Sequence, residues 1–119
     1  MSDMTKEKYW DNLINQSLLR FCLLKTLEKE ELHAYVLPKK IDEFSHGYCA
    51  TPSPGTLYTT VSGLEQEGYL QTRSAKKGGR TRKLYKLSSK GRQALQSATK
   101  SWSKVTFLIA KSCIYKQWE

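Results

Sequence analysis

The feature that most constrains the fold is a helical pattern followed directly by a hairpin pattern, in residues 53–91. Apolar side chains recur there every three or four residues, which places them on one face of a helix: Leu57, Val61 and Leu64. Ser53 suits the N-cap, Pro54 the first helical position, and Gly68 the end. We therefore expect a helix over residues 54–67, whose opposite face is small and polar: Thr59, Ser62, Gly63 and Gln66.

Two strand patterns follow this helix, in residues 69–73 and 82–87. The basic segment between them contains Gly78 and Gly79, which indicate a hairpin turn. A helix followed by a basic hairpin is the layout of a winged helix. The expected fold class is mainly α (α+β): a winged helix-turn-helix domain with a two-stranded β-hairpin wing and a long C-terminal dimerisation helix.

The same stretch resembles the signature of PadR-type transcriptional regulators. The matching residues occur in the family's order and spacing: Pro54-Gly55-Thr56-Leu57-Tyr58, Leu64-Glu65, Gly68, Gly78-Gly79-Arg80, Arg82-Lys83, Tyr85, Leu87 and Gly91. The resemblance covers roughly residues 13–110 and implies a DNA-binding regulator that dimerises through a single C-terminal helix. Two positions depart from it, because the family usually has arginine at the place of Gly63 and often proline at that of Thr59.

The charge is distributed unevenly. The chain has a net charge of +9, and residues 68–118 contain 13 of its 20 Lys and Arg but no Asp or Glu. Residues 1–67 hold the other 7 basic residues together with 10 of the 11 acidic ones. A basic half on a near-neutral scaffold is typical of a protein that binds a polyanion, and with the motif above it favours double-stranded DNA over a merely solvated basic surface.

Two helices are expected before residue 53. The first spans residues 5–29 and is apolar nearly all round, which predicts burial on more than one side. The second falls within residues 32–44, and Pro38 must lie in its first turn, so it should begin at 35–37. Its expected core residues are Tyr35, Val36, Leu37, Ile41 and Phe44.

A long last helix is expected from the N-cap Ser88 to about Tyr115. Apolar residues follow 3-4-3-4 spacing along it, at Leu95, Ala98, Trp102, Val105 and Ile109, and Leu108 widens the seam. About two heptads are too few for a helix pair to be stable alone. We expect residues 1–87 to form the DNA-binding domain and residues 88–119 a homodimer interface, with packing inside one chain as the alternative.

The expected DNA contacts lie on the third helix and on the wing. In the major groove, Thr59, Ser62 and Gln66 can reach base edges. Hydroxyl contacts to phosphate are expected from Thr51, Ser53, Thr56 and Tyr58. The wing is expected to contact the backbone or the adjacent minor groove through Lys76, Lys77, Gly79, Arg80, Arg82 and Lys83.

A possible effector site follows from a second resemblance. Ser101-Trp102-Ser103-Lys104 is similar to a segment of the PadR-type branch that senses multidrug or aromatic compounds. Two Trp102 side chains across a twofold axis could stack on a planar aromatic ligand, with Phe21 as a side wall and Arg20 favouring anionic ligands. One alternative is that the Trp102 side chains form a closed dimer core. Another is an effector-free module that binds DNA architecturally, or that binds RNA or another protein.

The remaining sequence patterns argue against an enzyme, a metal or cofactor protein and a membrane protein. No nucleophile and base pair, paired carboxylates or phosphate loop is present, so we expect no enzyme. The three cysteines and two histidines have no metal-site spacing, so no metal or cofactor is expected, and Cys22 and Cys113 should be buried. The polar N-terminus and the lack of an apolar run of about 20 residues predict a cytoplasmic protein without a membrane segment.

Overall fold

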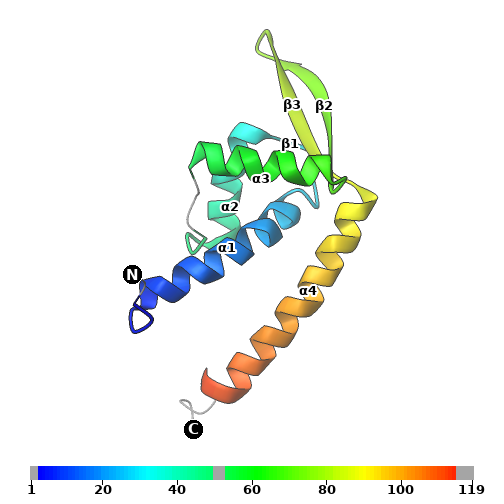
Figure 1. Ribbon diagram of the computed structural model, residues 1–119. Coiled ribbons are helices and arrows are strands. Elements are labelled where there is room, and N and C mark those ends of the chain that lie inside the picture. Colours follow the sequence, from blue (N-terminus) through cyan, green and yellow to red (C-terminus); the bar gives the residue numbers. More distant parts are fainter. Residues whose placement is uncertain (1–2, 50–52, 115–119) are drawn as a thin grey trace.

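The computed structural model describes residues 3–49 and 53–114. These residues form four helices and three strands (Figure 1). Their order is α1 (Glu7–Thr26), β1 (Leu32–His33), a 3-10 turn (Ala34–Val36), α2 (Leu37–Ser45), α3 (Pro54–Gln66), β2 (Leu70–Lys77), β3 (Arg80–Leu87), α4 (Ser89–Ile109) and a π-helical turn (Ala110–Ile114). This is the expected winged helix-turn-helix with a long last helix; Tyr115 lies outside the described residues.

The sheet is antiparallel with the strand order β1-β3-β2. Strands β2 and β3 pair from Leu70 opposite Leu87 to Lys77 opposite Arg80, which extends the wing beyond the strands expected from sequence. The short β1 pairs with β3 through Leu32 opposite Tyr85. The wing is thus the expected two-stranded hairpin. The third strand, β1, was not predicted, because two residues are too short to show any periodicity.

A two-residue turn closes the wing. Gly78 and Gly79 have φ values of 60° and 79°, and positive φ at both central residues defines the type I′ turn that matches the twist of a hairpin. Other residues adopt this conformation at an energetic cost, so the glycine pair fixes where the wing ends.

Helix α2 begins at Leu37 with Pro38 in its first turn, as expected. Its core contribution is smaller than predicted. Leu37 and Ile41 are buried, but Tyr35 is 51% exposed and Phe44 41% exposed, so their assignment to the core was wrong. The reason is local: the 3-10 turn places Tyr35 outside the helix, and Phe44 lies in the last turn before the left-handed His46.

The core lies between α1, α2, α3 and the inner face of the sheet. Its largest fully buried side chains are Tyr85, Leu23, Leu27, Leu37, Ile41 and Val61. Cys22 is buried there as expected, and so is Cys49; the side chain of Cys113 lies outside the described part of the chain. Burial raises the pKa of Cys22 to about 12, with a smaller contribution from Cys49, so both thiols stay protonated as small apolar groups.

A compact joint fixes the base of α4 to the end of α3. Ser88 caps α4, as expected, by accepting a hydrogen bond from the Gly91 amide at 3.0 Å, and its hydroxyl donates to the Gly68 carbonyl at 2.6 Å. The Ser88 amide donates to the Tyr69 carbonyl at 3.2 Å. A Cβ at Gly91 would overlap that carbonyl oxygen and lie 2.7 Å from Leu87 Cδ1, so only glycine fits.

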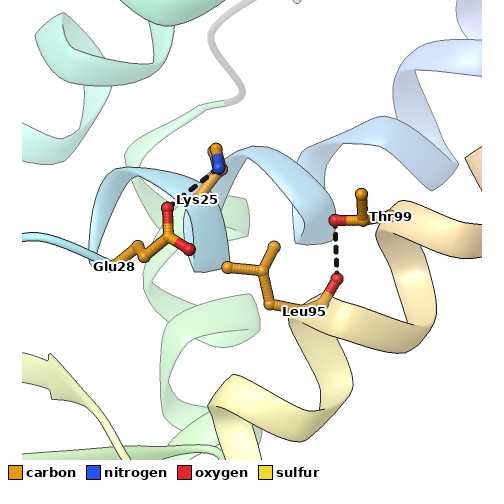
Figure 2. A network of polar contacts seen from close by, with 4 residues as sticks. All are labelled: Lys25, Glu28, Leu95 and Thr99. Carbon is orange, nitrogen blue, oxygen red and sulfur yellow. Dashed lines mark hydrogen bonds and ion pairs between the residues drawn. The ribbon is translucent and has the colours of Figure 1, made fainter.

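Beyond this joint, α4 runs past α1 and away from the domain (Figure 1). Its first half is packed: the Leu95 side chain points toward the α1 turn that carries Lys25 and is 4% exposed (Figure 2). Its second half exposes Val105, Phe107, Leu108 and Ile109. The Cα radius of gyration is 16.6 Å, against about 13.5 Å for a compact domain of this length. The chain thus carries an apolar helix face that its own core leaves uncovered.

Candidate nucleic-acid interface

Helix α3 presents two different faces. It buries one against the core through Leu57, Val61 and Leu64. On the opposite face Thr59 and Gln66 are exposed, and Ser62 and Gly63 are partly exposed. No atom outside the local backbone lies within 4 Å of a Cβ built at Gly63, so the residue that replaces the family arginine leaves this face open. The sequence pattern thus predicted the exposed face correctly.

The first turn of α3 is tied by its cap. The Ser53 hydroxyl accepts a hydrogen bond from the Thr56 amide at 3.2 Å and donates to Thr56 Oγ1 at 3.0 Å. Both residues are exposed at the start of α3, and so is Tyr58. These three expected phosphate contacts therefore lie together, whereas Thr51 lies outside the described residues.

Thr59 has a defined hydrogen-bonding character. Its hydroxyl donates to the Gly55 carbonyl at 2.9 Å within the helix, so the proton is already used. While this bond is kept, the oxygen can act toward a partner as an acceptor. Among base edges in the major groove, acceptors recognise the amino groups of adenine and cytosine.

The wing carries its charges on two faces, because successive residues of a strand point to opposite sides. Lys83 shares the inner face with buried Tyr85, whereas Arg80 and Arg82 lie on the outer face. The register places Lys76, opposite Thr81, on the inner face as well. Arg82 and Lys83, both of which are expected to contact phosphate, therefore lie on opposite faces of the wing.

Arg82 lies over an aromatic ring. Its guanidinium lies 4.7 Å from the centroid of Tyr35, and the Tyr35 ring stacks on His33 at 5.5 Å. His33 Nδ1 lies 3.2 Å from the Lys83 carbonyl oxygen, which ties this stack back to the wing strand. Neither His33 nor Tyr35 was expected at this surface, since the stack depends on the unpredicted β1.

A cavity of about 560 Å³ opens beside α3. Three tyrosines from different elements line it, namely Tyr35, Tyr58 and Tyr85. Tyr85 forms the buried side, and burial raises its pKa, with smaller contributions from Glu65 and Tyr58. The exposed ring of Tyr58 thus stands at the edge of an apolar depression and not on a flat polar surface.

Glu65 joins α3 to both wing strands. Its carboxylate accepts a hydrogen bond from Thr72 Oγ1 at 2.7 Å and lies 3.9 Å from Lys83 Nζ. Sequence reasoning included Glu65 in the family signature but gave it no role. A long-range contact of this kind leaves no periodic signal in the sequence.

The three residues expected to bind an effector lie on α1 and α4. The rings of Phe21 and Trp102 are 6.4 Å apart at 50°, and both line a depression of about 680 Å³ between the two helices. Leu18, Thr99 and Phe107 also line it. Arg20 is exposed on α1 and is not among the lining residues. The structure thus brings together two of the three.

Other kinds of site find no support in residues 3–49 and 53–114. No group of three or more His, Cys, Asp or Glu side chains there is placed to hold a metal ion. No helix in the same residues has the length and apolar character needed to cross a membrane.

A helix-turn-helix with an exposed polar face beside a basic hairpin defines the winged helix-turn-helix class of DNA-binding proteins. The "Transcriptional regulator PadR-like family" matches residues 23–97, and the chain belongs to this family. This family is one of transcriptional regulators, which agrees with the class of DNA-binding proteins that the fold defines.

Two curated relatives are transcriptional regulators by name. The chain is 34% identical over 80 residues to Rv3488 of Mycobacterium tuberculosis, which covers 67% of this chain and 71% of that protein. It is 28% identical over 96 residues to YqjI of Escherichia coli, which covers 81% of this chain but only 44% of YqjI. The chain thus spans less than half the length of this second relative.

A solved structure shows the same fold. Bacillus subtilis PadR in complex with operator DNA matches with a TM-score of 0.61 at 24% identity, over 69% of this chain and 47% of that one. The fold of the chain is therefore that of proteins in this family.

Proposed function

We propose that this chain is a transcriptional regulator and not an enzyme, and that it acts as a homodimeric repressor that binds a palindromic operator. The observation that carries the proposal is the exposed polar face of α3, which lies beside a basic wing. The wing belongs to residues 68–118, which contain no acidic residue. The operator complex of the B. subtilis protein supports DNA as the partner. The cell compartment that fits this activity is the cytoplasm.

In this proposal α3 enters the major groove. Thr59, as an acceptor, reads an adenine or cytosine amino group, while Ser62 and Gln66 contact neighbouring bases. The caps and first turn of α3, with Ser53, Thr56 and Tyr58, face phosphates; Thr51 is assigned the same role from sequence. Gly63 puts no side chain on the base-reading face, so specificity leans partly on DNA shape.

The wing contributes charge without base specificity. Lys76, Lys77, Gly79 and Arg80 lie at or beside the turn, where they would meet the backbone or minor groove. Arg82 and Lys83 approach from opposite faces of the wing, so a single strand of phosphates engages one of them and not both.

The second half of α4 supports the dimer. Val105 is 47% exposed, and Phe107, Leu108 and Ile109 are exposed beside it. Helix α1 exposes Trp10, Leu13 and Ile14, which gives a partner's α4 an apolar surface to cover. Of the expected seam, Ala98 and Trp102 are partly buried, and Leu95 is already used by its own core, so the interface centres on residues 102–109.

We also propose that a planar aromatic effector enters between the last helices. The support is the depression lined by Phe21 and Trp102, whose rings could stack on such a ligand. An effector-free winged helix remains the alternative, with the same aromatic rings closed into a dimer core.

Selection of bound fragments from random DNA tests the main proposal. We expect a palindrome whose half-sites are centred about one helical turn apart, because two recognition helices of a twofold dimer meet the same face of the duplex. A single unpaired half-site, or selection of no preferred sequence, would contradict it and favour the architectural module.

A further inference from the structure

Glu65 is a carboxylate in an unexpected place. It lies on α3, within one helical turn of Ser62 and Gln66, and its side chain is 28% exposed. The next acidic residue after Glu67 is the last residue of the chain, so the wing itself contains none. A negative charge beside the proposed DNA contacts repels phosphate and weakens binding.

The side chain of Glu65 contacts both strands of the wing. Thr72 lies on β2 and Lys83 on β3, and these two partners occupy successive inner-face positions of the wing ladder, where Thr72 is opposite Tyr85 and Lys83 opposite Ser74. One carboxylate therefore spans both wing strands from the recognition helix. Its bond to Thr72 is short at 2.7 Å, and its oxygen lies 3.9 Å from the Lys83 ammonium.

We propose that Glu65 is a positioning residue that raises DNA specificity. It fixes the angle of the wing against α3, and it neutralises Lys83 so that this lysine does not bind phosphate on every sequence. This role of Glu65 rests on the proposed DNA surface. The contacts of Glu65 with Thr72 and Lys83 lower the affinity for non-specific DNA, and they keep the wing in the orientation that the operator requires.

The test compares Glu65→Gln, Thr72→Val and the matched control Glu67→Gln, which removes an exposed carboxylate two residues away. Binding of the selected operator and of a random duplex is measured between about 50 and 200 mM salt. Glutamine can still accept the Thr72 hydrogen bond, so Glu65→Gln removes mainly the charge.

For Glu65→Gln we expect the random duplex to bind about threefold tighter at the lowest salt, a salt slope steeper by about one, and a lower ratio of operator to random affinity. Thr72→Val should lower that ratio without tightening random binding. The control should change neither the slope nor the ratio.

A purely structural role would weaken both DNA affinities together and lower thermal stability, which would overturn the proposal. An unchanged slope and ratio in Glu65→Gln would overturn it too. If the wild-type protein bound no duplex at all, the proposed DNA surface itself would fail, and this outcome is distinct from the other two.

Discussion

The indole of Trp102 and the phenyl ring of Phe21 lie 6.4 Å apart, centroid to centroid, inside one chain. Helix α4 therefore already has an aromatic contact with α1 of its own subunit. Phe21 in turn lies 6.2 Å from Phe44, which extends the aromatic group toward α2. Any ligand that enters beside Trp102 must share this surface with Phe21.

A planar aromatic compound should quench Trp102 fluorescence in a saturable way, because stacking on the indole places the ligand within contact distance. The measurement is a fluorescence titration of the wild type and of Trp102→Ala, in which Trp10 and Trp118 still report non-specific effects. If a broad panel of such compounds gave the same response in both proteins, the effector proposal would be wrong. A concurrent loss of DNA affinity would identify the compound as an inducer.

The exposed seam predicts dimerisation. Light scattering of the wild type should give about twice the 13.7 kDa mass of one chain. Val105→Asp should abolish the dimer, because a buried unpaired charge is costly in the interface. The monomer should stay folded, because Val105 is half exposed in the single chain. Gln96→Glu, at an exposed position nearer the base of α4, is the control and should remain dimeric. A Val105→Asp dimer would exclude this interface.

Wing and helix substitutions should have different effects on DNA binding. Arg80→Ala should weaken binding to all sequences alike and reduce the salt slope by about one, because it removes a proposed phosphate contact. Thr59→Val keeps the shape but removes the acceptor, so it should change base preference at one position of each half-site. Lys8→Ala is the control, because Lys8 is an exposed residue of α1. Equal effects of both changes on random and operator DNA would argue against α3 as the reading helix.

Two glycines predict opposite effects on stability. Gly91→Ala should lower the free energy of unfolding by about 2 kcal/mol or more, because the added Cβ overlaps the Tyr69 carbonyl. Gly63→Ala should raise it by up to about 1 kcal/mol, since nothing lies within 4 Å of the new methyl group and alanine favours helix. Urea unfolding measures both. A stable Gly91→Ala protein would show that the joint can relax.

The buried thiol predicts a stability change at alkaline pH. The fold raises the pKa of Cys22 from 9.0 to about 12, so the unfolded chain loses this proton first. The contribution of the Cys22 thiol to the free energy of unfolding is complete below pH 9 and should be lost as the pH rises toward about 12. Unfolding of wild type and Cys22→Ala at several pH values tests this: the variant should be less stable at neutral pH but less sensitive between pH 9 and 11. An equal pH dependence would contradict it.

Local chemistry made α3, the wing turn and the start of α4 predictable. Ser53 and Ser88 were identified as caps because N-capping depends on residue type and the next three positions. Gly78 and Gly79 identified the wing turn for the same reason. The helical spacing of Leu57, Val61 and Leu64 correctly divided α3 into a buried and an exposed face.

What could not be predicted depends on contacts between distant segments. Strand β1 exists only because Leu32 pairs with Tyr85, more than fifty positions later. The Arg82 stack on Tyr35 and the Glu65 bond to Thr72 arise from the same tertiary packing. Tyr35 and Phe44 were assigned to the core from hydrophobicity alone, which does not distinguish a core side chain from one at a surface patch.

The joint of Ser88 and Gly91 makes α4 a lever. The helix has 21 residues and is about 31 Å long, and its base cannot slide because Gly91 is packed against the Tyr69 backbone. A tilt of about 10° there displaces the far end by about 5 Å. In the proposed dimer, the far ends of two α4 helices meet. A small change in how they meet would then change the distance and angle between the two α3 helices that are proposed to read DNA.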